Sequence, residues 1–190
     1  MLIIITAPSG AGKTSITRYL LQRFPQLAFS VSAATRPQRS DEINGVDYYF
    51  MSLEEFHRKI QNDEFIEWEM VYEGKYYGTL KTEIQRIKAM HKIPILDIDV
   101  KGAIHVQEQY LERSLSIFVQ PPSIEELKRR LELRATESPE ALQDRLNKAA
   151  YEISFRSHFD HIIINDSLDR ACHEAGLIIS ALFKQQGVPG

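Results

Sequence analysis

The sequence predicts an α/β fold in which helices cover both faces of a mainly parallel sheet. Apolar runs of strand length alternate with helical patterns, which favours strands joined by helical crossovers. The runs lie at 2–6, 93–100, 115–119 and 161–165. Because each run is continuously apolar, it is typical of a parallel strand buried on both faces. A chain of 190 residues is long enough for one structural unit with a sizeable core.

The first apolar run leads into a glycine-rich segment and then a helical pattern. The segment consists of Ala7, Pro8, Ser9, Gly10, Ala11, Gly12, Lys13, Thr14 and Ser15. Glycines let backbone N–H groups surround a phosphate, and the helix N-terminus adds partial positive charge. Lys13 can reach the β- and γ-phosphates of a nucleotide, and the Thr14 hydroxyl can bind Mg²⁺. The segment therefore predicts a phosphate-binding loop on a three-layer P-loop NTPase core. The alternative is an ordinary strand-to-helix turn, and Ala7 stands where the strict motif has glycine.

Composition narrows the classes of partner. The net charge of −3 gives no support for nucleic-acid binding. The apolar runs are too short to span a membrane, and the first one continues into the loop, unlike a signal peptide. Cys172 is the only cysteine, which excludes an intrachain disulfide and a thiolate metal cluster. We expect a cytoplasmic protein with neither a nucleic acid nor a membrane as partner.

Two segments interrupt the alternation of strands and helices. Residues 35–79 contain strand patterns at 46–51 and 64–72 with a helix start at Ser52 between them, which predicts a small mixed α/β insert. The core is then formed by 1–34 and 80–190. A second, polar segment at 133–139 joins two long helices that begin after Ser123 and Ser138, and predicts a short helical lid at about 130–145. Ser167 is expected to cap the last helix.

The insert carries two candidate binding groups. Arg36 and Arg39 lie on a proline-containing loop with Tyr48 downstream, and this set can bind a phosphate monoester because arginine offers paired donors. The alternative is a solvated basic loop. Glu67 lies in an apolar, aromatic strand, where a buried carboxylate would need donors such as guanine N1–H and N2–H. The alternative is that Glu67 faces water.

Acidic and basic residues of the core form two further candidates. Asp97 and Asp99 end an apolar run, and an acid at a strand end assists Mg²⁺ binding in P-loop enzymes, although it can equally cap a helix. Arg130, Arg134 and Arg145 flank the segment at 133–139. They supply positive charge for phosphoryl transfer or, alternatively, cover a solvated helix face.

Taken in order, these motifs resemble the guanylate kinase family over roughly residues 2–184. The resemblance rests on the phosphate loop, Ser32–Arg39 with Asp47-Tyr48, Phe65–Trp68, Tyr76–Gly78, Ile95–Asp99, the 130–137 lid and Asn165-Asp166. It implies transfer of the γ-phosphoryl group of ATP to GMP with Mg²⁺ as cofactor. It leaves a monomer and a homodimer equally open.

The resemblance also implies roles for individual residues. ATP would be bound by Pro8, Ser9, Gly10, Ala11, Gly12, Lys13, Thr14 and Ser15, with Asn165 toward the adenine. GMP would be bound by Ser32, Arg36, Arg39, Tyr48, Glu67, Tyr77, Thr79 and Asp99. Lys13, Arg130, Arg134 and Arg145 would be catalytic. Thr14 would hold Mg²⁺, with Asp97 or Asp99 assisting through water.

The chain departs from the family pattern at several positions, among them Ala7, Ala34, Leu133 and Ala135. Two other functions fit parts of the sequence. A non-catalytic interaction module of the same fold would not need Lys13 and Thr14. A kinase of another phosphorylated acceptor, such as a ribose bisphosphate, would not need Ser32 and Glu67 to read a base.

Overall fold

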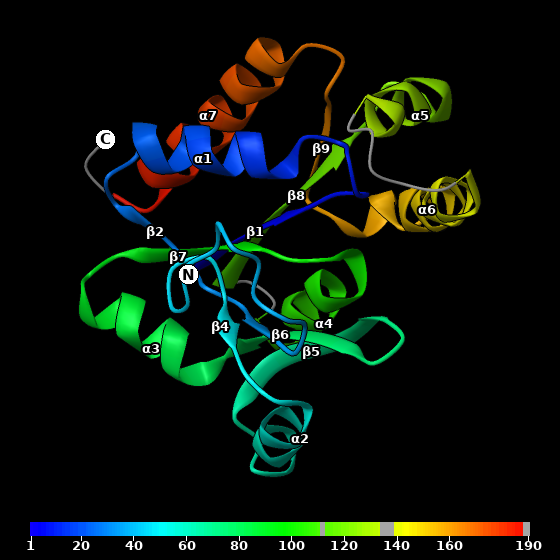
Figure 1. Cartoon of the computed structure of the whole chain (residues 1–190). Coiled ribbons are helices and arrows are strands. Elements are labelled where there is room, and N and C mark those ends of the chain that lie inside the picture. The colour runs from blue at the N-terminus through cyan, green and yellow to red at the C-terminus, as the bar shows by residue number, and fades with distance from the viewer. Residues whose placement is uncertain (111–112, 134–138, 188–190) are drawn as a thin grey trace.

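The core of the protein is a five-stranded parallel sheet with the strand order β2-β7-β1-β8-β9. The computed structural model describes residues 1–110, 113–133 and 139–187. The strands are β1 (Leu2–Thr6), β2 (Leu27–Phe29), β7 (Ile93–Asp97), β8 (Ser114–Gln120) and β9 (His161–Ile164). β1 lies in the middle of the sheet (Figure 1). The predicted α/β class and parallel sheet are confirmed.

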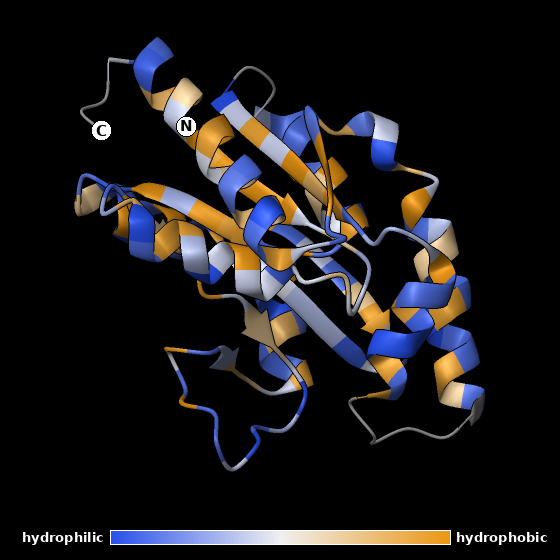
Figure 2. Cartoon of the chain, turned by 90° about the horizontal axis from the view of Figure 1, so that it is seen from above, coloured by the Kyte–Doolittle hydropathy of each residue, from blue (hydrophilic) through white to orange (hydrophobic). Residues whose placement is uncertain are grey.

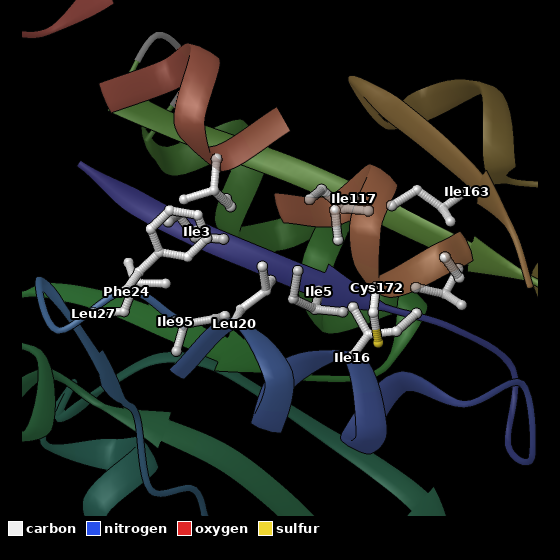
Figure 3. Packing of buried hydrophobic residues seen from close by; sticks show 14 of the residues in the cluster. Ile3, Ile5, Ile16, Leu20, Phe24, Leu27, Ile95, Ile117, Ile163 and Cys172 are labelled. Carbon is white, nitrogen blue, oxygen red and sulfur yellow. The ribbon is translucent and has the colours of Figure 1, made fainter. Parts of the chain in front are cut away.

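Helices cover both faces of this sheet. Every residue of β1 is buried, and since successive side chains of a strand point to opposite faces, both faces must be covered. Ile3 and Ile5 pack with α1 (Lys13–Arg23) and α7 (Leu168–Gln185), as Figure 3 shows. Leu2 and Ile4 belong to a second cluster on the other face. That cluster includes side chains of α3 (Lys81–Ala89) and α4 (Val100–Tyr110). Figure 2 shows the same layering as apolar strands between helices with hydrophilic stripes.

A second sheet of four strands, in the order β4-β3-β6-β5, lies beside the core (Figure 1). Its strands are β3 (Ala33–Ala34), β4 (Tyr49–Phe50), β5 (Phe65–Tyr72) and β6 (Lys75–Leu80). The helix α2 (Leu53–Gln61) places Phe56 in the small core of this sheet, against Phe65. Ser52 caps α2 by accepting a hydrogen bond from the Glu55 N–H at 3.0 Å.

Two helices form a separate packing unit next to the core. Leu127 and Leu131 of α5 (Ile124–Glu132) pack with Leu146 and Ala149 of α6 (Pro139–Ile153). The Ser123 hydroxyl caps α5. Residues 134–138, which include Arg134, Ala135 and the expected cap Ser138, lie outside the described residues, so the predicted lid is described only at its helical flanks. A short 3₁₀ turn (Arg156–His158) leads from α6 to β9.

Three local expectations were wrong. The strand expected at 46–51 is reduced to β4, because the Asp47 carboxylate accepts from Ile43 N–H at 2.7 Å and the Asn44 side chain accepts from Phe50 N–H at 2.9 Å. Such side-chain bonds favour a turn over a strand. The run at 93–100 ends as a strand at Asp97, and Val100 already begins α4. Ser167 occupies the cap position of α7, but its side chain makes no capping hydrogen bond.

No helix in the described part of the chain is long and apolar enough to cross a membrane.

Candidate active site

The glycine-rich loop between β1 and α1 has the backbone shape that its sequence predicts. Gly10 and Gly12 adopt φ angles of 91° and 100°, which favour glycine because a side chain would be strained there. Ala7 is buried and is not among the described residues with positive φ. Its departure from the motif therefore causes no backbone strain.

Asn165 braces this loop from outside. Its side-chain amide donates to the Ala11 carbonyl at 2.7 Å, and the residue is only 4% exposed. A Cβ at Gly12 would lie 2.2 Å from the same amide nitrogen. The Asn165 carbonyl in turn accepts from the Arg130 guanidinium at 2.9 Å. Asn165 thus links the loop to Arg130, whose guanidinium also pairs with Glu126 at 2.8 Å.

The loop opens into a cavity of about 350 Å³. The cavity is bounded by the loop, the end of β7, the second sheet and α6. Its lining includes Ala7, Pro8, Ser9, Gly10, Gly12, Lys13, Thr14, Ser15, Ser32, Tyr48, Glu67, Val71, Tyr77, Gly78, Asp97, Ile98, Asp99, Arg145, Lys148 and Glu152. Residues expected to contact two different nucleotides therefore face one space.

Lys13 is held at the end of β7. Its ammonium lies 2.7 Å from the Asp97 carboxylate and donates to the Ile98 carbonyl at 3.0 Å. Burial disfavours the charged ammonium, but the contact with Asp97 outweighs it and raises the pKa of Lys13 above its ordinary value. The Thr14 hydroxyl also points at Asp97, at 3.4 Å. A cation, a hydroxyl and a carboxylate therefore meet at the mouth of the loop.

The Thr14–Asp97 pair suits Mg²⁺, which prefers hard oxygen ligands and commonly uses one or two carboxylates together with substrate phosphates. No group of three or more His, Cys, Asp or Glu side chains that could hold a metal alone occurs among the described residues. Asp99 bonds to the start of a helix. Its carboxylate accepts from the Gly102 N–H at 2.9 Å and so caps α4, the alternative that the sequence left open, while still lining the cavity.

Glu67 is a buried carboxyl group that lines the same cavity. It is 6% exposed and accepts a hydrogen bond from the Thr79 hydroxyl at 2.6 Å. Burial raises the pKa of Glu67 to about 8; the Thr79 bond opposes this shift and the charges of Asp99 and Glu69 add to it. The alternative in which Glu67 faces water is excluded.

Helix α4 approaches this carboxyl closely. A Cβ added at Gly102 would lie 2.6 Å from Glu67 Oε2. The backbone of α4 therefore forms one wall of the Glu67 pocket, and Glu67 would have to move if position 102 carried a side chain.

The expected phosphate-binding residues of the insert are only partly brought together. Tyr48 and Tyr77 line the cavity with their ring centroids 5.9 Å apart. Arg36 stacks over Tyr48 at 4.8 Å but makes a bidentate ion pair with Glu42, at 2.5 and 2.7 Å. This pair lowers the pKa of Glu42 to about 2. Arg39 is exposed and does not line the cavity.

Sequence reasoning missed Glu42, although its place six residues after Arg36 in a polar loop was visible. It also missed Lys148 and Glu152, which line the cavity from α6 together with Arg145. Their spacing of three and seven residues from Arg145 places all three on one helix face, which the sequence could have shown. Glu152 is 8% exposed, and burial raises its pKa to about 7. Lys148 donates to the Val71 carbonyl of β5 at 3.4 Å.

The glycine-rich loop and the buried Glu67 carboxyl thus line one cavity, and sequence comparison assigns the family of the chain. The family model described as guanylate kinase matches residues 1–182. The chain belongs to the guanylate kinase family. It is 51% identical over 168 residues to a guanylate kinase of Porphyromonas gingivalis, covering 88% of this chain and 89% of that protein. It is 46% identical over 185 residues to one of Bacteroides thetaiotaomicron, covering 97% and 91%.

Solved structures agree with the family assignment. The crystal structure of guanylate kinase from Anaplasma phagocytophilum superposes with a TM-score of 0.77 at 32% identity, covering 95% of this chain and 85% of that one. A Thermus thermophilus protein, TT1252, shares the fold at 15% identity with a TM-score of 0.54, covering 95% and 96%.

We expect Lys13→Met to lower turnover at least 100-fold while leaving the fold intact. The ammonium is the cation at the loop mouth, and removing one such preorganised charge costs about 3–4 kcal/mol of transition-state stabilisation. Steady-state kinetics at saturating nucleotide, with circular dichroism as the folding check, measures this. Lys128→Met is the matched control, since Lys128 lies on α5 with a distant partner, Glu132, at 3.9 Å. Near wild-type turnover of folded Lys13→Met would contradict the role.

We expect Glu67→Gln to flatten the pH dependence of stability in the ligand-free protein. The carboxyl keeps its proton to about pH 8 when folded, against an ordinary value of 4.5. Between these values the native state binds more protons than the unfolded state, so wild-type stability falls as pH rises. The difference from Glu67→Gln should grow by on the order of 2–4 kcal/mol between pH 5 and 8.

Urea unfolding at each pH measures this difference. Glu64→Gln is the control, because Glu64 pairs with Lys59 at the surface and its pKa is lowered rather than raised. Parallel pH curves for wild type and Glu67→Gln would show that the Glu67 carboxyl is ionised in the ligand-free protein.

Proposed function

We propose that this chain transfers the γ-phosphoryl group of ATP to GMP, giving ADP and GDP. The family assignment supports this reaction. The observation that carries the proposal within the structure is a single cavity that is lined both by the glycine-rich loop and by a buried carboxyl group of the second sheet. A kinase that moves a phosphoryl group between two nucleotides needs both features in one space.

The loop would bind the phosphates of ATP. Its backbone N–H groups and the start of α1 supply partial positive charge, and Lys13 adds a full charge beside them. Asp97 keeps Lys13 at the loop mouth. Asn165 contributes by fixing the Ala11 carbonyl and the close packing at Gly12, in addition to the adenine-side role that the family resemblance implies.

Thr14 and Asp97 would hold Mg²⁺, directly or through water. The cation would neutralise charge on the transferring phosphoryl group. Asp97 is the better placed of the two acids because the Thr14 hydroxyl points at it, whereas Asp99 caps α4 through Gly102.

The part of the cavity that Glu67 lines would bind the guanine base. An ionised Glu67 can accept from N1–H and N2–H together, and the Thr79 and Ser32 hydroxyls can serve the remaining polar edge. Thr79 already contacts Glu67, and Ser32 lines the same cavity. Adenine would place an N1 lone pair against the carboxylate and has no 2-amino group. The site would therefore reject adenine because the Glu67 oxygens would lack hydrogen-bond donors, and not because of the size of the base.

The GMP phosphate and the transferred group would lie between the loop and Glu67. Tyr48 and Tyr77 line the cavity, and Arg36 is held beside Tyr48 by Glu42. We assign the acceptor phosphate to these side chains with Arg39. Arg145, which reaches the cavity from α6, and Arg130 and Arg134 would stabilise the developing charge. In this assignment residues 35–79 form the acceptor-binding insert, 1–34 and 80–190 the core, and 130–145 the lid.

We expect the purified chain to phosphorylate GMP with a kcat/KM at least 10⁴-fold above that for AMP, because sites built on hydrogen bonds reject substrates that lack them by about this factor. Glu67→Gln should erode this ratio, whereas Arg36→Ala should weaken both acceptors to a similar degree. A coupled ADP-release assay with GMP, dGMP, AMP, UMP and a ribose bisphosphate measures it. A GMP/AMP ratio unchanged by Glu67→Gln would contradict the base-reading role.

We further expect GMP binding to release a proton near pH 7. The ligand-free Glu67 carboxyl is largely protonated there, since burial raises its pKa to about 8, but guanine requires the carboxylate. Affinity should therefore rise up to about tenfold per pH unit below pH 8. Calorimetry in buffers of different ionisation enthalpy measures the proton, and Glu67→Gln, which cannot ionise, is the control. Equal proton release by both proteins would assign it to another group.

A further inference from the structure

Glu83 is a buried carboxylate that neither the cavity nor the family motifs include. It lies in the first turn of α3 and is 2% exposed. Burial by itself would raise its pKa, but the hydrogen bonds that it accepts outweigh burial and hold its pKa below the ordinary value. Glu83 is therefore an ionised group in the interior, and the donors around it account for that.

Four donors converge on the two oxygens of Glu83. Oε1 accepts from the Val31 backbone N–H at 3.0 Å and from Arg86 Nη2 at 2.7 Å. Oε2 accepts from the Tyr49 hydroxyl at 2.9 Å and from Arg86 Nε at 2.8 Å. Arg86, on the next turn of α3, neutralises the charge, whereas Val31 and Tyr49 belong to other segments.

Those two segments carry residues of the acceptor site. Val31 directly precedes Ser32, and Tyr49 directly follows Tyr48; Ser32 and Tyr48 both line the cavity. The Tyr49 N–H also donates to the Ser32 carbonyl at 2.9 Å, which joins the two segments to each other. Glu83 thus bonds, from a core helix, one sequence neighbour of Ser32 and one of Tyr48.

We propose that Glu83 is a positioning residue for the acceptor nucleotide: it aligns Ser32 and Tyr48 by bonding their neighbours Val31 and Tyr49. This inference rests on the proposed function. Glu83 does not line the cavity, so it acts on GMP through the segments that it holds. The ATP side has its own supports in Asp97 and Asn165, which do not bond to Glu83 in the described residues. The effect of Glu83 is therefore confined to one substrate.

The test compares GMP and ATP parameters in Glu83→Gln and Tyr49→Phe. A glutamine keeps the shape but loses the charge and turns an amide N–H toward a donor. We expect Glu83→Gln to raise both the KM and the calorimetric Kd for GMP about tenfold, the effect of one broken buried hydrogen bond. The KM for ATP should stay within about twofold. Tyr49→Phe removes a single bond and should raise the GMP values in the same direction by a smaller factor.

Asp160→Asn is the matched control. Asp160 Oδ2 also accepts from a backbone N–H and a hydroxyl, both of Ser116, at 2.8 and 2.7 Å, but ties β8 to the segment before β9. It should lower Tm without changing the GMP parameters. A double variant, Glu83→Gln with Ser32→Ala, should lose less GMP affinity than the two single effects combined, because Glu83 acts partly through Ser32.

Three outcomes would overturn the inference: parallel changes in GMP and ATP parameters, an equal GMP effect in Asp160→Asn, or unchanged GMP values in Tyr49→Phe. The last remains decisive if Glu83→Gln does not fold. Failure of the wild-type chain to bind or phosphorylate GMP would overturn the proposed function and this inference with it. Normal wild-type binding that Glu83→Gln and Tyr49→Phe leave unchanged would overturn only the inference.

Discussion

The structure depends on the burial of β1 between β7 and β8 in a parallel sheet. Because the strands run in the same direction, the carboxyl ends of β1 and β7 emerge at one edge, which places the glycine-rich loop beside Asp97. Apolar packing on both faces of β1 fixes this edge. The ion pair between Lys13 and Asp97 then follows from sheet topology. The two residues are 84 positions apart in sequence, but the loop after β1 brings Lys13, at the start of α1, to the end of the neighbouring strand β7.

The second sheet supplies what the core lacks. The core provides backbone N–H groups and positive charge, which suit phosphates but carry no preference for a base. The four-stranded sheet adds Glu67. Burial raises the pKa of this carboxyl group, so the group is largely neutral near pH 7 in the ligand-free protein. A carboxyl group held neutral by burial ionises more readily when hydrogen-bond donors are placed beside it. Under the proposed function, base selectivity and the protonation state of Glu67 would therefore depend on the same two oxygen atoms.

The sequence predicts those parts of the site that are encoded by neighbouring residues. The loop and its Lys13 can be predicted because a strand pattern, glycines and a helical pattern follow one another. The strand β7 can be predicted because its apolar run is continuous. The bonds of Asn165 to Ala11, of Arg36 to Glu42 and of Glu83 to Tyr49 were not predicted. The first and third join segments 154 and 34 residues apart, so no local pattern records them. The length of β4 was overestimated because side-chain hydrogen bonds that favour a turn compete with strand propensity.

The contact between α4 and Glu67 shows how the position of a carboxyl group depends on an atom that is missing. Gly102 leaves room for the carboxyl because it has no Cβ, and a methyl group there would lie 2.6 Å from Oε2. Adding that single carbon would force the Glu67 carboxyl to shift, whereas no residue of the glycine-rich loop is among the nearest neighbours of that carbon. In evolutionary terms, Glu67 can keep its present position only while position 102 remains glycine.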